Sequence, residues 1–168
     1  MKFILVIALF GIVTIVSCNQ KSNREAVLQM HIDSLEQRLS ESYKPGFGEF
    51  MFGIQLHHAK LWFAGLNENW RLADFEIHEI MELTEDIQKY QAERKESKMI
   101  TLLNPALDSV NAAIGQKNLN NFKSSFILLT NTCNNCHKAV NYEFNIVKIP
   151  DSPPLSNQVF KMEEKSKK

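Results

Sequence analysis

The sequence predicts an all-α protein: an antiparallel four-helix bundle with an extra N-terminal helix and an irregular C-terminal tail. Across residues 48–143, apolar side chains recur at steps of three and four in four successive segments, which is the spacing of one helix face. The alternating pattern of a half-buried strand is hard to find in the chain. Short turn segments join the four stretches, and an apolar stripe is stable only when it is buried. We therefore expect neighbouring helices to pack antiparallel around one core.

The first two helices of the predicted bundle run from about Gly48 to Gly65 and from about Asn67 to Gln91. Asn67 is expected to be the N-cap of the second helix. The first apolar stripe consists of Met51, Ile54, His58, Leu61 and Gly65. The second consists of Trp70, Ala73, Ile77, Ile80, Thr84 and Ile87. The outer face of the second helix is expected to carry its acids, either as a solvated surface or as a patch that steers a basic partner. These acids are Asp74, Glu76, Glu79, Glu82, Glu85 and Asp86.

The last two helices of the predicted bundle lie on either side of a turn marked by Gly115 and Asn118. The third stripe consists of Ile100, Leu103, Leu107, Val110 and Ile114. Pro105 is expected either to kink this helix or, with Asn104 as cap, to begin a second piece. The fourth stripe consists of Leu119, Phe122, Phe126, Leu129, Cys133, Cys136 and Val140. Three prolines then prevent helix, so residues 144–168 are expected to form an extended tail.

Residues 1–17 have the pattern of a secretory signal peptide. Lys2 precedes a 14-residue apolar run, which is shorter than the ~20 residues of a bilayer-spanning helix. The run ends in Ile-Val-Ser-Cys at residues 15–18, which resembles the lipobox of bacterial lipoproteins. That resemblance implies cleavage before Cys18 and a lipid on its sulfur, with an uncleaved short anchor as the alternative. We expect an exported domain held to a bacterial membrane bilayer, periplasmic or on the outer face.

Residues 18–47 are expected to comprise the lipidated cysteine, a polar tether and a short stalk helix. Within residues 24–43, Leu28, Ile32, Leu35 and Leu39 alternate steps of four and three, which is the spacing of a coiled coil. The stretch covers only about two heptads. Because this length is too short to establish a coiled coil, two interpretations stay open: a stalk helix that forms homo-oligomers, or a helix that packs on the main domain.

Composition limits the classes of function open to this chain. It has 168 residues, 44% hydrophobic and 23% charged, with a formal net charge of 0, as expected for one globular domain. No basic patch of the kind that binds nucleic acid is evident. Nor does the sequence contain a Ser/His/Asp arrangement, a glycine-rich phosphate loop or an HExxH motif, so we expect a protein that is not an enzyme.

The motif with the clearest chemistry is Cys133-Asn-Asn-Cys136-His137, a CxxCH sequence. CxxCH is the attachment sequence of c-type haem, and the chain offers one such site, for one covalently bound haem c. On a helix the two thiols project from one face, where each can form a thioether bond with a haem vinyl group. His137 lies on the same side, where its imidazole can be the proximal ligand of the iron. A redox dithiol or half of a zinc site are the alternatives, but zinc usually needs a second ligand pair.

A CxxCH near the end of the last helix of a four-helix bundle resembles cytochrome c′ and its relatives. A closer likeness is to a poorly characterised subgroup of exported cytochrome-like proteins. It rests on Gln55, on residues 58–65 (HAKLWFAG), on Asn69-Trp70 with Leu72-Ala73, on the CNNCH segment, and on a tail like residues 154–160 (PLSNQVF). The cytochrome c′ resemblance implies covalent haem on Cys133 and Cys136, with His137 as the proximal ligand. It also implies that the first bundle helix lines the distal side.

On that first helix His58 is our candidate distal residue, because it shares the stripe of Ile54 and Leu61, whereas His57 lies beside it. His58 or, in reserve, Met51 is the candidate sixth iron ligand. The alternative for His58 is a hydrogen-bonded histidine at the edge of the core. The aromatic residues Trp62, Phe63, Trp70, Phe122 and Phe126 can likewise wall the haem or simply form the bundle core.

The expected function is electron transfer outside the cytoplasm by a membrane-anchored mono-haem cytochrome whose redox partner protein is unknown. The alternative is a five-coordinate haem module that binds or senses a small diatomic gas. Peroxidase-like chemistry, with His58 as the acid–base group, is a weaker third option.

Overall fold

The structure is a computed structural model that describes residues 24–41 and 45–162. The predicted signal peptide, Cys18 and the end of the tail lie outside the described residues. The chain divides after Lys44 into two units, and the first contains a helix over residues 24–41, within the range where the sequence predicts one. The described residues are all-α, with no strand among them. None of their helices is long and apolar enough to cross a bilayer.

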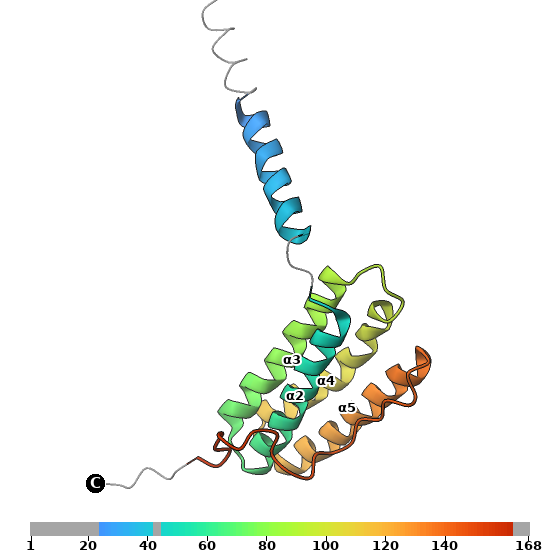
Figure 1. Cartoon of the computed structure of the whole chain (residues 1–168). Coiled ribbons are helices and arrows are strands. Elements are labelled where there is room, and N and C mark those ends of the chain that lie inside the picture. Colours follow the sequence, from blue (N-terminus) through green and yellow to red (C-terminus); the bar gives the residue numbers. More distant parts are fainter. Residues whose placement is uncertain (1–23, 42–44, 163–168) are drawn as a thin grey trace, which may run out of the picture. The chain divides into compact units, whose positions relative to one another are not determined.

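The second unit is a bundle of helices that follow one another in sequence (Figure 1). Its elements are α2 (Phe47–Leu66), α3 (Trp70–Tyr90), the 3-10 helix η1 (Ser97–Leu103), α4 (Asn104–Gly115) and α5 (Leu119–Ala139). The third predicted helix is therefore divided in two. Pro105 stands at the start of α4, so the prediction of a second piece is confirmed, although Leu103 and not Asn104 is its N-cap.

Two of the turns share one design, in which an asparagine ends one helix and begins the next. After α2, Glu68 adopts a left-handed conformation (φ 53°), and the Asn69 amide donates to the Ala64 carbonyl at 2.9 Å, closing a Schellman motif. The Asn69 side chain then accepts from the Leu72 amide and caps α3. The prediction of Asn67 as this cap is wrong: Asn67 follows the last turn of α2. The turn from α4 to α5 repeats the arrangement, with Asn118 as the capping residue.

The core is formed by the predicted stripes. Leu61, Ile77, Val110 and Phe122 are fully buried, one from each of the four α-helices of the bundle. Phe122 packs directly against the backbone of Gly65, where a Cβ atom would lie 2.1 Å from two of its ring atoms. Gly65 is therefore needed for the close approach of α2 and α5.

Gly65→Ala is expected to destabilise the purified full chain by about 1–3 kcal/mol, because the added methyl group must displace the buried ring of Phe122. Urea unfolding followed by circular dichroism measures the loss. Gly115→Ala is the matched control, since no atom lies within 4 Å of its added Cβ. That control should be neutral or stabilising by up to about 1 kcal/mol. Equal stability of the two variants would contradict the packing described here.

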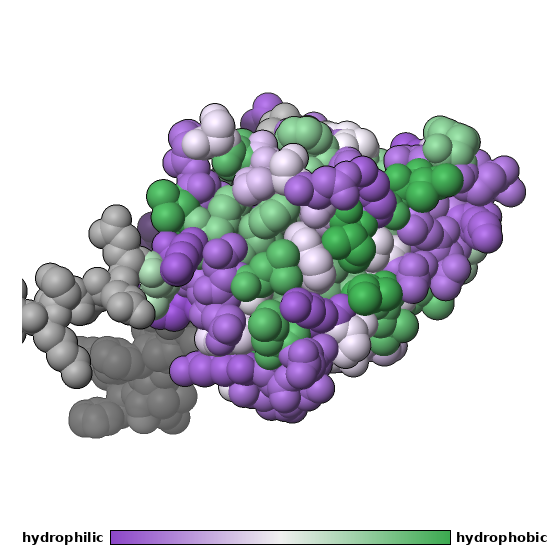
Figure 2. All heavy atoms as spheres, turned by 90° about the horizontal axis from the view of Figure 1, so that it is seen from below, coloured by the Kyte–Doolittle hydropathy of each residue, from purple (hydrophilic) through white to green (hydrophobic). Residues whose placement is uncertain are grey.

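The tail returns along the bundle after α5 (Figure 1). At its far end the Phe160 ring is buried against Phe63, with ring centroids 5.7 Å apart. The Asn69 side chain also donates to the Phe160 carbonyl at 3.0 Å. The tail is thus tied to the turn between α2 and α3, which explains why an irregular segment stays ordered. Figure 2 shows hydrophobic residues scattered among polar ones on the face seen there.

Candidate functional site

A cavity of about 420 Å³ lies between α2, η1, α5 and the segment that follows α5. Its size is typical of pockets that enclose a small-molecule ligand or cofactor. Cys133, Cys136 and His137 line it from α5, and Met51 and His58 line it from α2. The fold therefore brings the CxxCH motif together with both candidate ligands from the first helix of the bundle.

The two thiols lie in a protected environment on the last turns of α5. Cys136 is buried, and its Sγ lies 3.9 Å from the Met99 carbonyl of η1. Burial, with a smaller contribution from Cys136, raises the pKa of Cys133 to about 12, and burial also raises the pKa of Cys136. A reactive dithiol needs a lowered pKa instead, so the thiols do not have the environment of a redox dithiol.

His137 is held in one orientation by the chain that follows it. Its Nδ1 lies 2.6 Å from the backbone carbonyl of Asn145, which can only accept, so Nδ1 carries the proton and donates. The Nε2 atom is therefore unprotonated in the neutral ring and has its lone pair available. This is the arrangement found in metal-ligating histidines, where a second hydrogen bond fixes the tautomer and raises the basicity of the ligating nitrogen.

His58 is buried in the part of the cavity wall that α2 contributes, and its Nε2 lies 2.9 Å from the Thr130 hydroxyl of α5. That hydroxyl donates its own proton to the Phe126 carbonyl, so its oxygen accepts from His58 Nε2–H. Burial lowers the pKa of His58 to about 4, so the ring is neutral at pH 7. Its ring also contacts that of Phe126 in a tilted arrangement, with centroids 4.4 Å apart. His58 thus both lines the cavity and makes the hydrogen bond of a core histidine.

His57 belongs to a different cluster, on the α3 side of α2. Its Nδ1 lies 2.7 Å from Glu76 Oε2, and Lys60 Nζ lies 2.6 Å from Glu76 Oε1. The prediction that Glu76 lies on the solvent face is therefore wrong: its side chain is fully buried, and the His57 ring and the Lys60 ammonium of α2 contact its two carboxylate oxygens. Glu82 and Glu85 are exposed as predicted. His78 on α3 and His31 in the 24–41 helix are also exposed.

The predicted aromatic residues form core rather than cavity wall. Trp62 packs on Phe126 with centroids 4.9 Å apart, and Phe122 contacts Trp62, Trp70 and Phe126 at 5.9–6.2 Å. None of these residues, nor Phe63, lines the cavity. Of the two interpretations drawn from the sequence, the ordinary bundle core is the one that fits.

Segments before and between the helices also contribute residues to the cavity, and helix patterns in the sequence did not predict them. Arg94 and Glu96 line the cavity from the stretch between α3 and η1, with Arg94 Nε 3.3 Å from Glu96 Oε2. The guanidinium also lies over the ring of Phe47, 5.0 Å from its centroid. Arg94 and Glu96 thus form an ion pair in the cavity wall, so an anionic ligand group can bind Arg94 only in competition with Glu96. Helix periodicity carries no information about such a residue.

Comparison with protein-family models, with curated proteins and with solved structures finds no match for this chain. In residues 24–41 and 45–162, no group of three or more His, Cys, Asp or Glu side chains is arranged to hold a metal ion by itself. A zinc site built on the two cysteines would therefore lack a complete set of such ligands within this part of the chain.

Proposed function

We propose that this chain is a mono-haem c-type cytochrome, with a bundle of the cytochrome c′ type, that transfers electrons outside the cytoplasm. The observation that carries the proposal is the hydrogen bond from His137 Nδ1 to the Asn145 carbonyl, in the wall of a cavity that both CxxCH thiols share. A bound iron needs the free Nε2 that this bond leaves, and CxxCH has the spacing for thioether attachment. The cavity volume is also within the range of cofactor pockets.

Within this proposal each residue has a separate role. Cys133 and Cys136 hold the haem covalently, and His137 binds its iron. Arg94 could bind a haem carboxylate only by giving up its ion pair with Glu96, and His58 or Met51 is the candidate sixth ligand. Bound in this site, the haem would supply one-electron exchange between ferric and ferrous iron. The hydrogen bond from Nδ1 to the Asn145 carbonyl fixes the orientation of His137, which would influence the reduction potential.

A specific observation favours a second candidate, a five-coordinate haem module that binds or senses a diatomic gas. His58 Nε2 already donates to Thr130, and this bond must break before that nitrogen can bind iron. The pKa of about 4 keeps the ring neutral, so it does not leave the core to be solvated at pH 7. If neither His58 nor Met51 binds the iron, the sixth position remains open to a gas.

The location and partners of the protein are part of the proposal. Cys18 would carry the lipid anchor in a bacterial membrane, with the domain exported. Residues 24–43 would associate with a second copy: Leu28, Ile32 and Leu35 are about half exposed along the 24–41 helix, at coiled-coil spacing. Both features would confine electron exchange to partners at the same membrane surface.

One preparation tests function and location together. When the full chain is made in a bacterial host with a cytochrome c maturation system, we expect the haem absorbance to be found in the membrane fraction.

For the electron carrier, the reduced spectrum should be low-spin and change little on addition of carbon monoxide. His58→Ala should then open the iron to carbon monoxide, while the exposed His78→Ala is the matched control. Sedimentation of the detergent-solubilised protein measures its oligomeric state.

The outcomes separate the two candidates. A parent protein whose spectrum shifts at once with carbon monoxide supports the gas-binding module and contradicts electron transfer through a six-coordinate iron. If His58→Ala matches the parent in both spectrum and carbon monoxide binding, His58 is not on the distal side. Haem absorbance found only in the soluble fraction would contradict the lipid anchor.

A further inference from the structure

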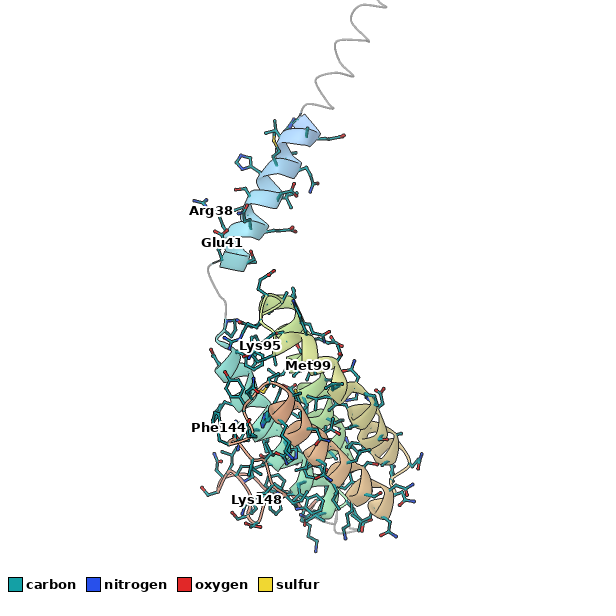
Figure 3. All side chains as sticks on the ribbon, turned by 90° about the vertical axis from the view of Figure 1, so that its right-hand side faces the viewer. Arg38, Glu41, Lys95, Met99, Phe144 and Lys148 are labelled. Atoms are coloured by element: carbon teal, nitrogen blue, oxygen red, sulfur yellow. The ribbon has the colours of Figure 1, made fainter. Side chains whose placement is uncertain are left out.

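The CxxCH segment is bound by the loop that follows it, residues 140–147, which we call the return loop. α5 ends in a third Schellman motif: Asn141 is left-handed (φ 64°), and the Tyr142 amide donates to the His137 carbonyl at 2.8 Å. The Asn145 amide then donates to the Tyr142 carbonyl at 2.9 Å, closing a turn. These two bonds reverse the chain and bring it back beside the last turns of α5. Figure 3 shows Phe144 and Lys148 on this returning segment.

The far end of the return loop is fastened by the side chain of Asn134, the first variable residue of the CxxCH motif. Its Nδ2 donates to the Val147 carbonyl at 2.8 Å, and its Oδ1 accepts from the Val147 amide, also at 2.8 Å. Asn134 therefore satisfies both backbone groups of one residue thirteen positions away. The asparagine side chain carries its donor and its acceptor on two separate atoms, so it can bind both groups of Val147 at once, and neither of these groups has a helix or sheet partner.

Between these two attachments lies the Asn145 carbonyl that accepts from His137 Nδ1. Its position is set on one side by the turn at Tyr142 and on the other by the clamp on Val147. We propose that Asn134 is a positioning residue: by clamping Val147, it holds the Asn145 carbonyl against His137 and so tunes the donor strength of the ligating imidazole. This inference rests on the proposed function, since it assumes that His137 binds iron.

The consequence for the iron follows from the chemistry of imidazole. A ring that donates a strong hydrogen bond from Nδ1 is a better electron donor through Nε2, and it stabilises the ferric state. If the clamp is removed, the return loop is free to move and this hydrogen bond weakens. The reduction potential should then rise, and the iron–histidine bond should weaken.

The test compares Asn134→Ala with Asn135→Ala in the full-length haem protein. Asn135 is exposed and occupies the second variable position of the same motif. Its replacement by alanine changes helix propensity by the same amount as Asn134→Ala. We expect Asn134→Ala to raise the reduction potential and, where the ferrous iron is five-coordinate, to lower the iron–histidine stretching frequency. Asn135→Ala should leave both near the parent values.

A second measurement does not depend on the haem signal. The Val147 amide should exchange with solvent about tenfold faster in Asn134→Ala than in the parent, the equivalent of one lost hydrogen bond. Asn134→Asp keeps the acceptor for this amide and should keep most of its protection. If Asn134→Ala cannot be purified, the parent and Asn134→Asp still decide the matter, because an unprotected Val147 amide in the parent overturns the clamp.

The two proposals fail in different ways. If neither the parent nor any variant holds covalent haem, the proposed function is wrong. If haem is attached and Asn134→Ala has the same potential and the same Val147 exchange rate as Asn135→Ala, the positioning role of Asn134 is wrong and the proposed function stands. Faster exchange with an unchanged potential would make the clamp purely structural and would also overturn the inference.

Discussion

The full chain, expressed with a cytochrome c maturation system, is expected to keep its haem stain after denaturing electrophoresis. Thioether bonds survive denaturation, whereas a haem held only by His137 is lost with the fold. The double variant Cys133→Ala/Cys136→Ala should lose the stain completely, since it removes both points of attachment in the cavity. A single Cys136→Ala variant retains one thiol and should show reduced attachment. This is the largest effect we expect from any substitution, because the signal is present or absent.

Cys18→Ser is the matched control for this experiment, because it removes the remaining cysteine without touching the CxxCH motif. We expect it to keep the haem stain. A colourless parent protein, from a host that matures other c-type cytochromes, would contradict haem attachment. Loss of stain in Cys18→Ser alone would place the requirement outside the motif.

The parts of the fold that could be predicted from the sequence are those that depend on local periodicity. The apolar stripe through Phe122, Phe126 and Leu129 continues directly into the two cysteines. The same spacing therefore predicts which face of α5 is buried and that both thiols lie on that face. His58 was likewise placed inward by its spacing from Ile54 and Leu61, and it is buried. His58 and the two cysteines then line a common cavity, because α2 and α5 pack together.

What could not be predicted depends on partners distant in sequence. Glu76 shares the inward phase of Ala73 and Ile80, but only its contacts with His57 and Lys60 across α2 explain a buried carboxylate. The hydrogen bond from His58 to Thr130 joins residues 72 positions apart. The Asn134 clamp on Val147 needs the chain reversal at the end of α5, for which the sequence offers no glycine.

The burial of His58 should also make stability depend on pH. In the unfolded chain this imidazole has its ordinary pKa of about 6.5, whereas burial lowers the folded value to about 4. Between these two values the unfolded state binds a proton that the folded state does not, so protons favour unfolding as pH falls. The contribution of His58 to stability is therefore complete above about pH 6.5 and is lost progressively down to about pH 4. The difference corresponds to about 3 kcal/mol, more than a hundredfold in the unfolding equilibrium.

Urea unfolding of the purified full chain and of His58→Gln, measured from pH 7.5 down to pH 4, isolates this contribution. Glutamine does not titrate in that range, and its amide can still donate toward Thr130. We expect the parent to lose about 3 kcal/mol more than His58→Gln across the range, while His78→Gln, at an exposed position on α3, should follow the parent. The other titrating groups are the same in the parent and in His58→Gln, so their contributions cancel in the comparison. Parallel curves for the parent and His58→Gln would mean that His58 is hydrated in solution and takes its proton without unfolding, and its hydrogen bond to Thr130 could not then be a fixed part of the core.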